Sequence, residues 1–243
     1  MASINSITSA TGTPFKGTHG MALRLMIPII IASIVILGSA WYFIPEKVKQ
    51  LATSQAQVAA TKTVSQFKSL RAYYTRNVIK KAVKNGSLKP HYDHSDSPNR
   101  IPLPATLIHD LSGILAEQGT AVKLYSPFPF PNRAARKLDD FGQRAWDQLS
   151  KDKTAVISEI QEINGRQVLR VAVGDTLVAQ GCVNCHNSHP ETPKKGWKLG
   201  DLRGILEINT DLGDSLAAGT ALTYQAMGAL SLLFLIGLLF FAR

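Results

Sequence analysis

Two long apolar runs frame the chain. The first is Leu25–Ile44 (LMIPIIIASIVILGSAWYFI) and the second is Ala221–Ala242 (ALTYQAMGALSLLFLIGLLFFA), and neither contains a charged residue. About twenty apolar residues in a helix span the roughly 30 Å of hydrocarbon in a bilayer. The pattern therefore predicts two transmembrane helices and divides the chain into a tail (1–23), a first span (24–44), a middle domain (45–219) and a second span (220–242).

The first run has a second interpretation as a cleaved signal peptide, because Gly38-Ser39-Ala40 offers small residues for cleavage. Its apolar stretch is longer than the about 7–15 residues typical of such signals, and a tail precedes it. Aromatic residues also gather where a helix leaves the membrane, and Trp41, Tyr42 and Phe43 close this run. A retained membrane anchor is the favoured interpretation.

The pattern changes between the two runs. From Glu46 to Lys84 the chain has no Pro or Gly, which predicts a long helix that ends at Asn85-Gly86. Shorter elements come next, some with apolar residues at helical spacing and others rich in β-branched residues. They are helices over 105–118 and 132–149, strands over 121–126 and 203–209, and a hairpin over 154–173 that turns at Asn164-Gly165. This order is typical of an α+β domain with an antiparallel sheet.

Both shorter helices have a distinct apolar face. The predicted core positions are Leu107, Leu111 and Ile114 in the first helix, and Leu138, Phe141, Ala145 and Leu149 in the second. Asn132 is the expected cap of the second helix. His109 points away from the apolar face of the first helix, so it is either exposed or turned towards something other than the main core.

The only two cysteines lie in the segment GCVNCHNSH (181–189). C-x-x-C-H is the attachment signature of a c-type haem. Two thiols one short helical turn apart can each form a thioether with a haem vinyl group, and the next residue places an imidazole under the iron. Cys182 and Cys185 are thus the candidate covalent attachment sites of one haem c, and His186 is the candidate proximal ligand of its iron.

Three other interpretations compete for this segment. A thioredoxin-like redox pair uses C-x-x-C, but that motif has no reason to carry a histidine immediately after it. A zinc site adds His189 to the same three residues, but the four ligands crowd into eight residues, well short of the usual separation between ligand pairs. A disulfide between cysteines this close closes almost no loop and stabilises little. Covalent haem is the favoured interpretation.

The formal net charge of +10 favours acidic partners or anionic lipid headgroups. It does not indicate nucleic acid, because no reader motif accompanies it. Lys16 and Arg24 sit near the start of the first span and Arg243 comes after the second, which predicts that both termini are in the cytoplasm. Lys47 and Lys49, just beyond the first span, weaken this signal. Since c-type haem is attached outside the bacterial cytoplasmic membrane, the middle domain is expected in the periplasm.

Several motifs together resemble a known family. YYTRNV, IPLPATLIHDLS, KLYSPFPFPNR, GCVNCHNSHP and WKLGDLRGILEI are similar, in content and order, to the periplasmic c-type-haem sensor domain found ahead of bacterial adenylate cyclases, histidine kinases and chemoreceptors. The resemblance covers nearly the whole segment between the spans. It implies a PAS-like antiparallel sheet with flanking helices that hold one haem, with CVNCH as the attachment site and His186 as an axial ligand.

The second axial ligand stays open. Some members of the resembling family take it from a cysteine on the long first helix, but both cysteines of this chain lie in the motif. His189 lies on the same side of a short helix as His186, so it does not easily reach the opposite haem face. His109 has suitable chemistry for iron and an unexplained orientation. An open or water-bound position is the alternative.

Residues just after the motif offer further contacts to a haem. Trp197 supplies a flat apolar wall, and cations suited to the two propionates are Lys194, Lys195, Lys198 and Arg203. The same cations are also typical of a solvated basic surface.

The expected function depends on the chain beyond the second span. The resembling sensors continue into a catalytic or signalling module, whereas this chain ends at Arg243. We expect a mono-haem membrane cytochrome of the sensor type, not an enzyme, that detects redox state or a small gaseous ligand. Its partner is a separate membrane protein or a second copy of the chain. The alternative is an electron-transfer subunit of a larger membrane redox complex, docked through small residues of the second span.

Overall fold

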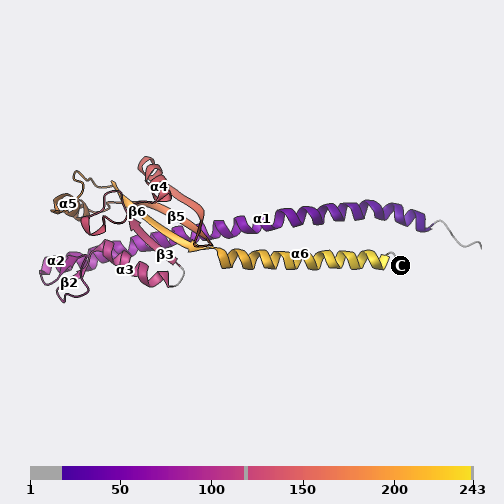
Figure 1. Ribbon diagram of the computed structural model, residues 1–243, viewed down its shortest axis with the longest axis horizontal. Coiled ribbons are helices and arrows are strands. Elements are labelled where there is room, and N and C mark those ends of the chain that lie inside the picture. Colours follow the sequence, from indigo (N-terminus) through magenta and orange to yellow (C-terminus); the bar gives the residue numbers. More distant parts are fainter. Residues whose placement is uncertain (1–17, 118–119, 242–243) are drawn as a thin grey trace, which may run out of the picture. The chain divides into compact units, whose positions relative to one another are not determined.

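The computed structural model describes the backbone of residues 18–117 and 120–241 (Figure 1). The chain divides into two compact units, one formed by its two ends (up to Lys47 and from Ala221) and the other by Val48–Thr220. The second unit combines helices with a four-stranded antiparallel sheet. The predicted α+β class with an antiparallel sheet and a long first helix is therefore confirmed.

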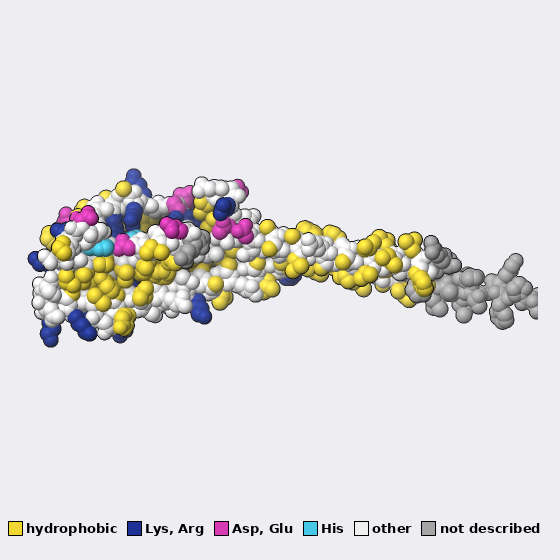
Figure 2. All heavy atoms as spheres, turned by 90° about the horizontal axis from the view of Figure 1, so that it is seen from below, with side chains coloured by type: hydrophobic (Ala, Val, Ile, Leu, Met, Phe, Trp, Pro, Cys, Tyr) yellow, Lys and Arg dark blue, Asp and Glu magenta, His cyan; other side chains and the backbone are white. Residues whose placement is uncertain are grey.

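Two helices supply the first unit. α1 (Thr18–Tyr74) contributes its first part and α6 (Gly213–Phe241) most of its length, and both are long and apolar enough to cross a membrane. Their apolar side chains face outward, as Ile36 does with 66% of its surface exposed. Figure 2 shows these helices covered by hydrophobic side chains with few charges. Trp41 donates a hydrogen bond from Nε1 to the Ser231 hydroxyl at 3.2 Å, so the two helices contact each other within this unit.

The first apolar run and the long helix after it form one element. α1 contains Pro45 and continues through a five-residue π-helical segment, η1 (Thr75–Ile79), into α2 (Lys80–Asn85). Gly86 ends α2 in the left-handed conformation (φ 69°) and donates its N–H to the carbonyl of Ala82 at 3.0 Å. The predicted end of the helix is confirmed, because glycine adopts this conformation without a clash of a Cβ atom.

The sheet has the strand order β3-β6-β5-β4. Its strands are β3 (Thr120–Tyr125), β4 (Val156–Ile163), β5 (Arg166–Thr176) and β6 (Leu202–Asp211). The predicted hairpin is β4–β5, and both of its turn residues, Asn164 (φ 53°) and Gly165 (φ 75°), have positive φ, as a type I′ turn requires. A short parallel pair, β1 (Lys89–His91) with β2 (Arg100–Pro102), is an element that the sequence pattern does not predict.

We expect Gly165→Ala to lower the free energy of unfolding by about 1–2 kcal/mol, because an L-residue with a side chain is strained in the left-handed region. No atom lies within 4 Å of a Cβ added at Gly165, so the cost is conformational and not steric. Gly113→Ala, on an exposed part of a helix and equally free of neighbours, is the matched control and should stabilise by up to about 1 kcal/mol. Chemical denaturation of the full chain in detergent measures both. Equal effects of the two changes would contradict the assigned turn.

Helices cover both faces of the sheet. On one face, α1 and α3 (Pro104–Ala116) pack against β3, β5 and β6 through Ala60, Val64, Phe67 and Ile108. On the other face, α4 (Asp140–Lys151) packs against β5 and β6 through Phe141, Ala145 and Leu149. Val171 and Ala172, consecutive residues of β5, enter different cores, as the two-residue period of a strand requires. The central strands β5 and β6 are therefore buried on both sides, whereas the edge strand β4 is partly exposed.

The predicted apolar face of α3 is partly wrong. Ile108 is 1% exposed and Leu111 and Leu115 pack beside it, whereas Ile114 is 59% exposed and Leu107 is only half-buried. The buried positions follow an i, i+3, i+7 spacing that starts one residue later than predicted. The face that packs on the sheet is thus rotated from the one that the sequence favours.

The predicted start of α4 is also wrong. The helix begins after Asp139, whose carboxylate accepts a hydrogen bond from the Gly142 N–H at 2.8 Å. Asn132 instead lies in a short 3-10 turn, η2 (Pro131–Arg133), and Leu138 is only half-buried. An aspartate at the N-cap position favours the start of a helix at the next residue, because its side chain satisfies backbone N–H groups that would otherwise lack a partner.

A network of charged residues lies in the sheet beneath α4. The Arg170 guanidinium donates from Nε to Glu207 at 2.8 Å and from Nη1 to Asp139 at 2.7 Å. Tyr125 donates its hydroxyl proton to the same Glu207, which is fully buried. The buried Arg170 and Glu207 therefore satisfy each other's hydrogen bonds, with Tyr125 and the more exposed Asp139 as further partners.

Candidate functional site

The C-x-x-C-H segment forms the helix α5 (Gln180–Ser188), between β5 and β6. The N–H groups of Cys182 and Val183 both bond to the carbonyl of Ala179, which fixes the first turn. Cys182 is half-buried and Cys185 is exposed, and both thiols are free, so no disulfide joins them. Residues three apart on a helix lie on neighbouring positions of one side, so the two thiols share a face of α5.

An apolar cluster lies beneath this helix. Val183, Leu177 and Trp197 are buried together, and Phe128 and Cys182 pack against them. Asn187 holds Trp197 from α5, since it donates to the Trp197 carbonyl and accepts from its N–H, both at 2.9 Å. The structure therefore brings Trp197, the predicted apolar wall, against the cysteine side of α5.

His186 is held by an arginine. Arg203 on β6 donates from Nε to His186 Nδ1 at 3.2 Å, and its other nitrogens donate to the Ser126 hydroxyl at 2.8 Å and the Phe128 carbonyl at 3.0 Å. Burial, reinforced by the Arg203 charge, lowers the pKa of His186 to about 4. His186 is thus neutral at physiological pH, which is the form of imidazole that binds metals. Within the described part of the chain, no hydrogen bond involves its Nε2.

The lysines predicted near the haem differ in their contacts. Lys194 places its ammonium over the rings of Phe128 and Trp197, at 4.5 and 4.3 Å from their centroids. Lys195 and Lys198 are exposed, and Lys198 contacts Asp201 through its backbone, donating its N–H to the carboxylate and accepting from the Asp201 N–H. Of the residues predicted to contact a haem beside the motif, the structure brings Trp197, Arg203 and Lys194 to the site.

His109 is not in contact with His186 among the described residues. Its ring lies on α3, where Arg136 donates from Nη1 to His109 Nδ1 at 2.9 Å. Burial and then the charges of Arg133 and Arg136 lower the pKa of His109 to about 3. The side chain that does cover His186 is Phe130, whose ring centroid lies 5.6 Å away. The hydrogen bond from Arg136 explains why the His109 side chain points away from the main core.

The sequence does not reveal one pair at this site. Arg71 of α1 forms a mostly buried ion pair with Asp175 at the end of β5. Burial raises the pKa of the neighbouring Cys182 thiol. The charge of Arg71 lowers it again in part, and the charge of Asp175 raises it. Arg71 and Asp175 are separated by more than a hundred residues, so no local pattern predicts their contact.

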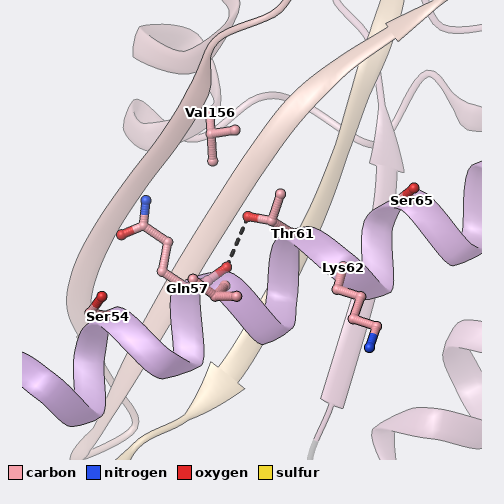
Figure 3. Close-up of a pocket in the computed structure, with 7 residues that line it drawn as sticks. Ser54, Gln57, Thr61, Lys62, Ser65 and Val156 are labelled. Atoms are coloured by element: carbon pink, nitrogen blue, oxygen red, sulfur yellow. Dashed lines mark hydrogen bonds between the residues drawn. The ribbon is translucent and has the colours of Figure 1, made fainter.

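The structure has a further open hollow of about 570 Å³ between α1 and the edge strand β4 (Figure 3). Polar residues of α1 such as Ser54, Gln57 and Lys62 line it, with Val156 opposite, and Thr61 bonds back to the Gln57 carbonyl at 2.8 Å. No cysteine, histidine or carboxylate of the described chain lines this hollow, so α5 is the candidate site. Among the described residues, no three His, Cys, Asp or Glu side chains converge as a metal-binding group.

Comparisons with known proteins give one solved structure and one family that match this chain. No curated protein sequence matches the chain. Among solved structures, the chain is similar to one titled "Crystal structure of the cyanobacterial heme-protein Tll0287", with 17% identity, a TM-score of 0.40, and coverage of 62% of this chain and 91% of that one. The family description Tll0287-like matches residues 47–210, which cover nearly all of the Val48–Thr220 unit. This match spans more than half of the chain, which therefore belongs to the Tll0287-like family.

Proposed function

We propose that the chain is a membrane-anchored, mono-haem c-type cytochrome of the sensor type. The observation that carries the proposal is α5, where two free thiols on one helix face are followed by a neutral His186 whose Nε2 has no hydrogen-bond partner among the described residues. Membership of the Tll0287-like family supports it, because Tll0287 itself is described as a heme-protein.

The residues present fit a covalently attached haem. Each thiol would add across one vinyl group, with sulfur bonding one vinyl carbon and the thiol hydrogen moving to the other, which would leave the oxidation state of the iron unchanged. Cys185 is exposed and Cys182 lies at the edge of the apolar cluster, so both thiols would hold the group beside the apolar wall of Trp197. Haem would supply an iron that accepts one electron or binds a small gaseous ligand.

Arg203 sets the proton position on His186. Because Nδ1 accepts a hydrogen bond from Arg203, the neutral ring carries its proton on Nε2. For Nε2 to hold an iron, this proton would have to move to Nδ1, and Arg203 would then lose its bond to His186 while keeping those to Ser126 and Phe128. Arg203 therefore positions the imidazole of the protein without haem.

We propose that α1 and α6 anchor the protein in the bacterial cytoplasmic membrane, with the α5-containing unit in the periplasm and both termini in the cytoplasm. Two helices of sufficient length and apolar character support the anchoring. The charged residues beside the spans and the external attachment of c-type haem support the orientation. A separate membrane protein or a second copy of the chain is the proposed partner for signalling, and neither nucleic acid binding nor enzymatic turnover is part of the proposal.

The experiment that tests this function is the optical spectrum of the purified full chain, oxidised and reduced, with carbon monoxide added to the reduced form. We expect a high-spin reduced haem that binds carbon monoxide, because the side chain best suited as a second ligand, His109, bonds to Arg136 instead. A low-spin spectrum indifferent to carbon monoxide would contradict gas sensing and favour electron transfer with two protein ligands. His109→Ala would then show whether His109 is the second of them.

A further inference from the structure

One face of α1 changes character as the helix reaches the end of the sheet. Ala60, Val64 and Phe67 on this face are apolar and pack against the strands. Lys68 and Arg71 continue the same face, since residues three or four apart are neighbours on a helix surface. The helix therefore contacts the sheet first through apolar side chains and then through two cations.

The two cations hold the end of β5. Lys68 donates from Nζ to the Gly174 carbonyl at 2.6 Å. Arg71 donates from Nη1 to Asp175 Oδ2 at 3.0 Å and from Nη2 to Asp175 Oδ1, so this ion pair is bidentate. Asp175 is 7% exposed, and salt screens a buried pair much less than an exposed one. Directional hydrogen bonds thus connect α1 to two consecutive residues of β5.

This end of β5 leads directly into the candidate haem site. The register of β5 against β6 shifts between Asp175 and Thr176, where the strand ends, and α5 begins at Gln180. The backbone of Gly174 is packed so closely that an added Cβ would lie 2.8 Å from the Lys153 carbonyl oxygen. The cations of α1 therefore hold a fixed point of the sheet, close along the chain to the start of α5.

The ion pair also acts on α5 through space. After burial, which has the largest influence, the pKa of Cys182 responds to Arg71 and then to Asp175. The pKa of His186 responds first to burial and to Arg203, then to Asp175 and less to Arg71. Both members of the pair therefore lie within electrostatic reach of the residues that would attach the haem and bind its iron.

We propose that the Arg71–Asp175 pair, with Lys68 beside it, couples the oxidation state of the haem to helix α1. The proposal rests on the function proposed above. Loss of one electron from the iron to a one-electron acceptor adds a positive charge at α5, which attracts Asp175 and repels the two cations. Oxidation therefore weakens the hold of α1 on the end of β5, and reduction restores it. α1 is also long and apolar enough to cross a membrane, which makes it a route for a signal out of this unit.

The test uses the haem-loaded full chain in detergent, oxidised with ferricyanide or reduced with dithionite. Hydrogen–deuterium exchange reports local opening of the α1 turn that contains Lys68 and Arg71. We expect this turn to exchange faster in the oxidised form than in the reduced form. Because coupling between two events is reciprocal, changes to the ion pair should also shift the reduction potential.

The two single variants should shift the potential in opposite directions. Arg71→Gln removes a cation that disfavours the oxidised iron, so the potential should fall. Asp175→Asn removes an anion that favours the oxidised iron, so the potential should rise. The combined variant, Arg71→Gln with Asp175→Asn, should have a potential closer to that of the unchanged protein than either single variant, and should lose the difference in exchange between the two redox states.

The combined variant also serves if a single variant fails to fold, which circular dichroism detects. Removal of one partner leaves a buried charge without compensation, whereas removal of both does not. The matched control is Arg166→Gln with Asp211→Asn, an exposed ion pair at the opposite end of β5. Nine residues at roughly 3.3 Å each place Arg166 about 30 Å from Asp175. This control should change neither the potential nor the redox-dependent exchange of α1.

Three results would overturn the proposal. One is equal exchange of the α1 turn in both redox states of the unchanged protein. Another is a redox-dependent difference in exchange that persists in the combined variant. The third is a shift of the potential in the same direction in both single variants. Absence of covalent haem from the unchanged protein on a denaturing gel would instead overturn the proposed function, because α5 would then hold no iron to oxidise.

Discussion

We expect Cys182→Ala combined with Cys185→Ala to abolish the covalent haem attachment proposed above, while the fold and both apolar helices stay intact. The reason is that these are the only two cysteines of the chain, so no other thiol can form the thioether. Cys185 is exposed and Cys182 borders the apolar cluster, so their loss removes little buried surface. Haem staining of a denaturing gel measures covalent attachment, and circular dichroism of the purified chain in detergent measures the fold.

Two further variants sharpen this result. Ser188→Ala changes the same helix without touching a thiol and is the matched control, for which full haem staining is expected. His186→Ala should keep a stained band, since both thiols remain, but should lose the spectrum of the unchanged protein because an axial ligand is missing. A haem band that survives in the double cysteine variant would remove α5 as the attachment site.

The candidate haem-attachment residues could be identified from the sequence because their spacing is local. Cys182, Cys185 and His186 lie within five residues, and a short helix is enough to place them. The hairpin at Asn164-Gly165 was predictable for the same reason, since its two residues determine the turn. By contrast, the partners of His109 and Arg71 come from distant segments, and only the packing of α1, α3 and the 126–137 segment determines them.

The errors in α3 and α4 also have a physical cause. In α3 several leucines and isoleucines give more than one possible apolar face, and contact with the sheet selects the one with Ile108. In the segment before α4, Asn132 and Asp139 are both good capping residues. Asp139 is the cap in the structure because its carboxylate also meets Arg170, a residue of β5 that no local pattern connects to it. Tertiary contacts thus decide between local signals of similar strength.

Arg170→Ala should destabilise the protein by about 3–5 kcal/mol, because removal of one partner leaves a buried charge without compensation. Glu207 is 0% exposed and receives two hydrogen bonds from Arg170, so only the Tyr125 hydroxyl would remain to solvate its carboxylate. Asp139 would lose the same partner and remain as a cap alone. Chemical denaturation of the full chain, followed by the fluorescence of its tryptophans, measures the change.

Two comparisons show whether the buried charge is the cause. Arg166→Ala, four residues earlier on the same strand, breaks a pair with Asp211 in which the arginine side chain is 74% exposed, and should cost less than about 1 kcal/mol. Arg170→Met with Glu207→Leu removes both charges, and should recover most of the stability lost in Arg170→Ala, because well-packed apolar residues replace buried ion pairs at little cost. In this double variant Asp139 stays exposed to solvent and still caps α4, and Tyr125 is only partly buried. These two side chains therefore tolerate the double change better than the buried Glu207 tolerates the loss of Arg170 alone. If the double variant is as unstable as Arg170→Ala, the network stabilises the domain through its specific geometry and not through compensation of the Glu207 charge.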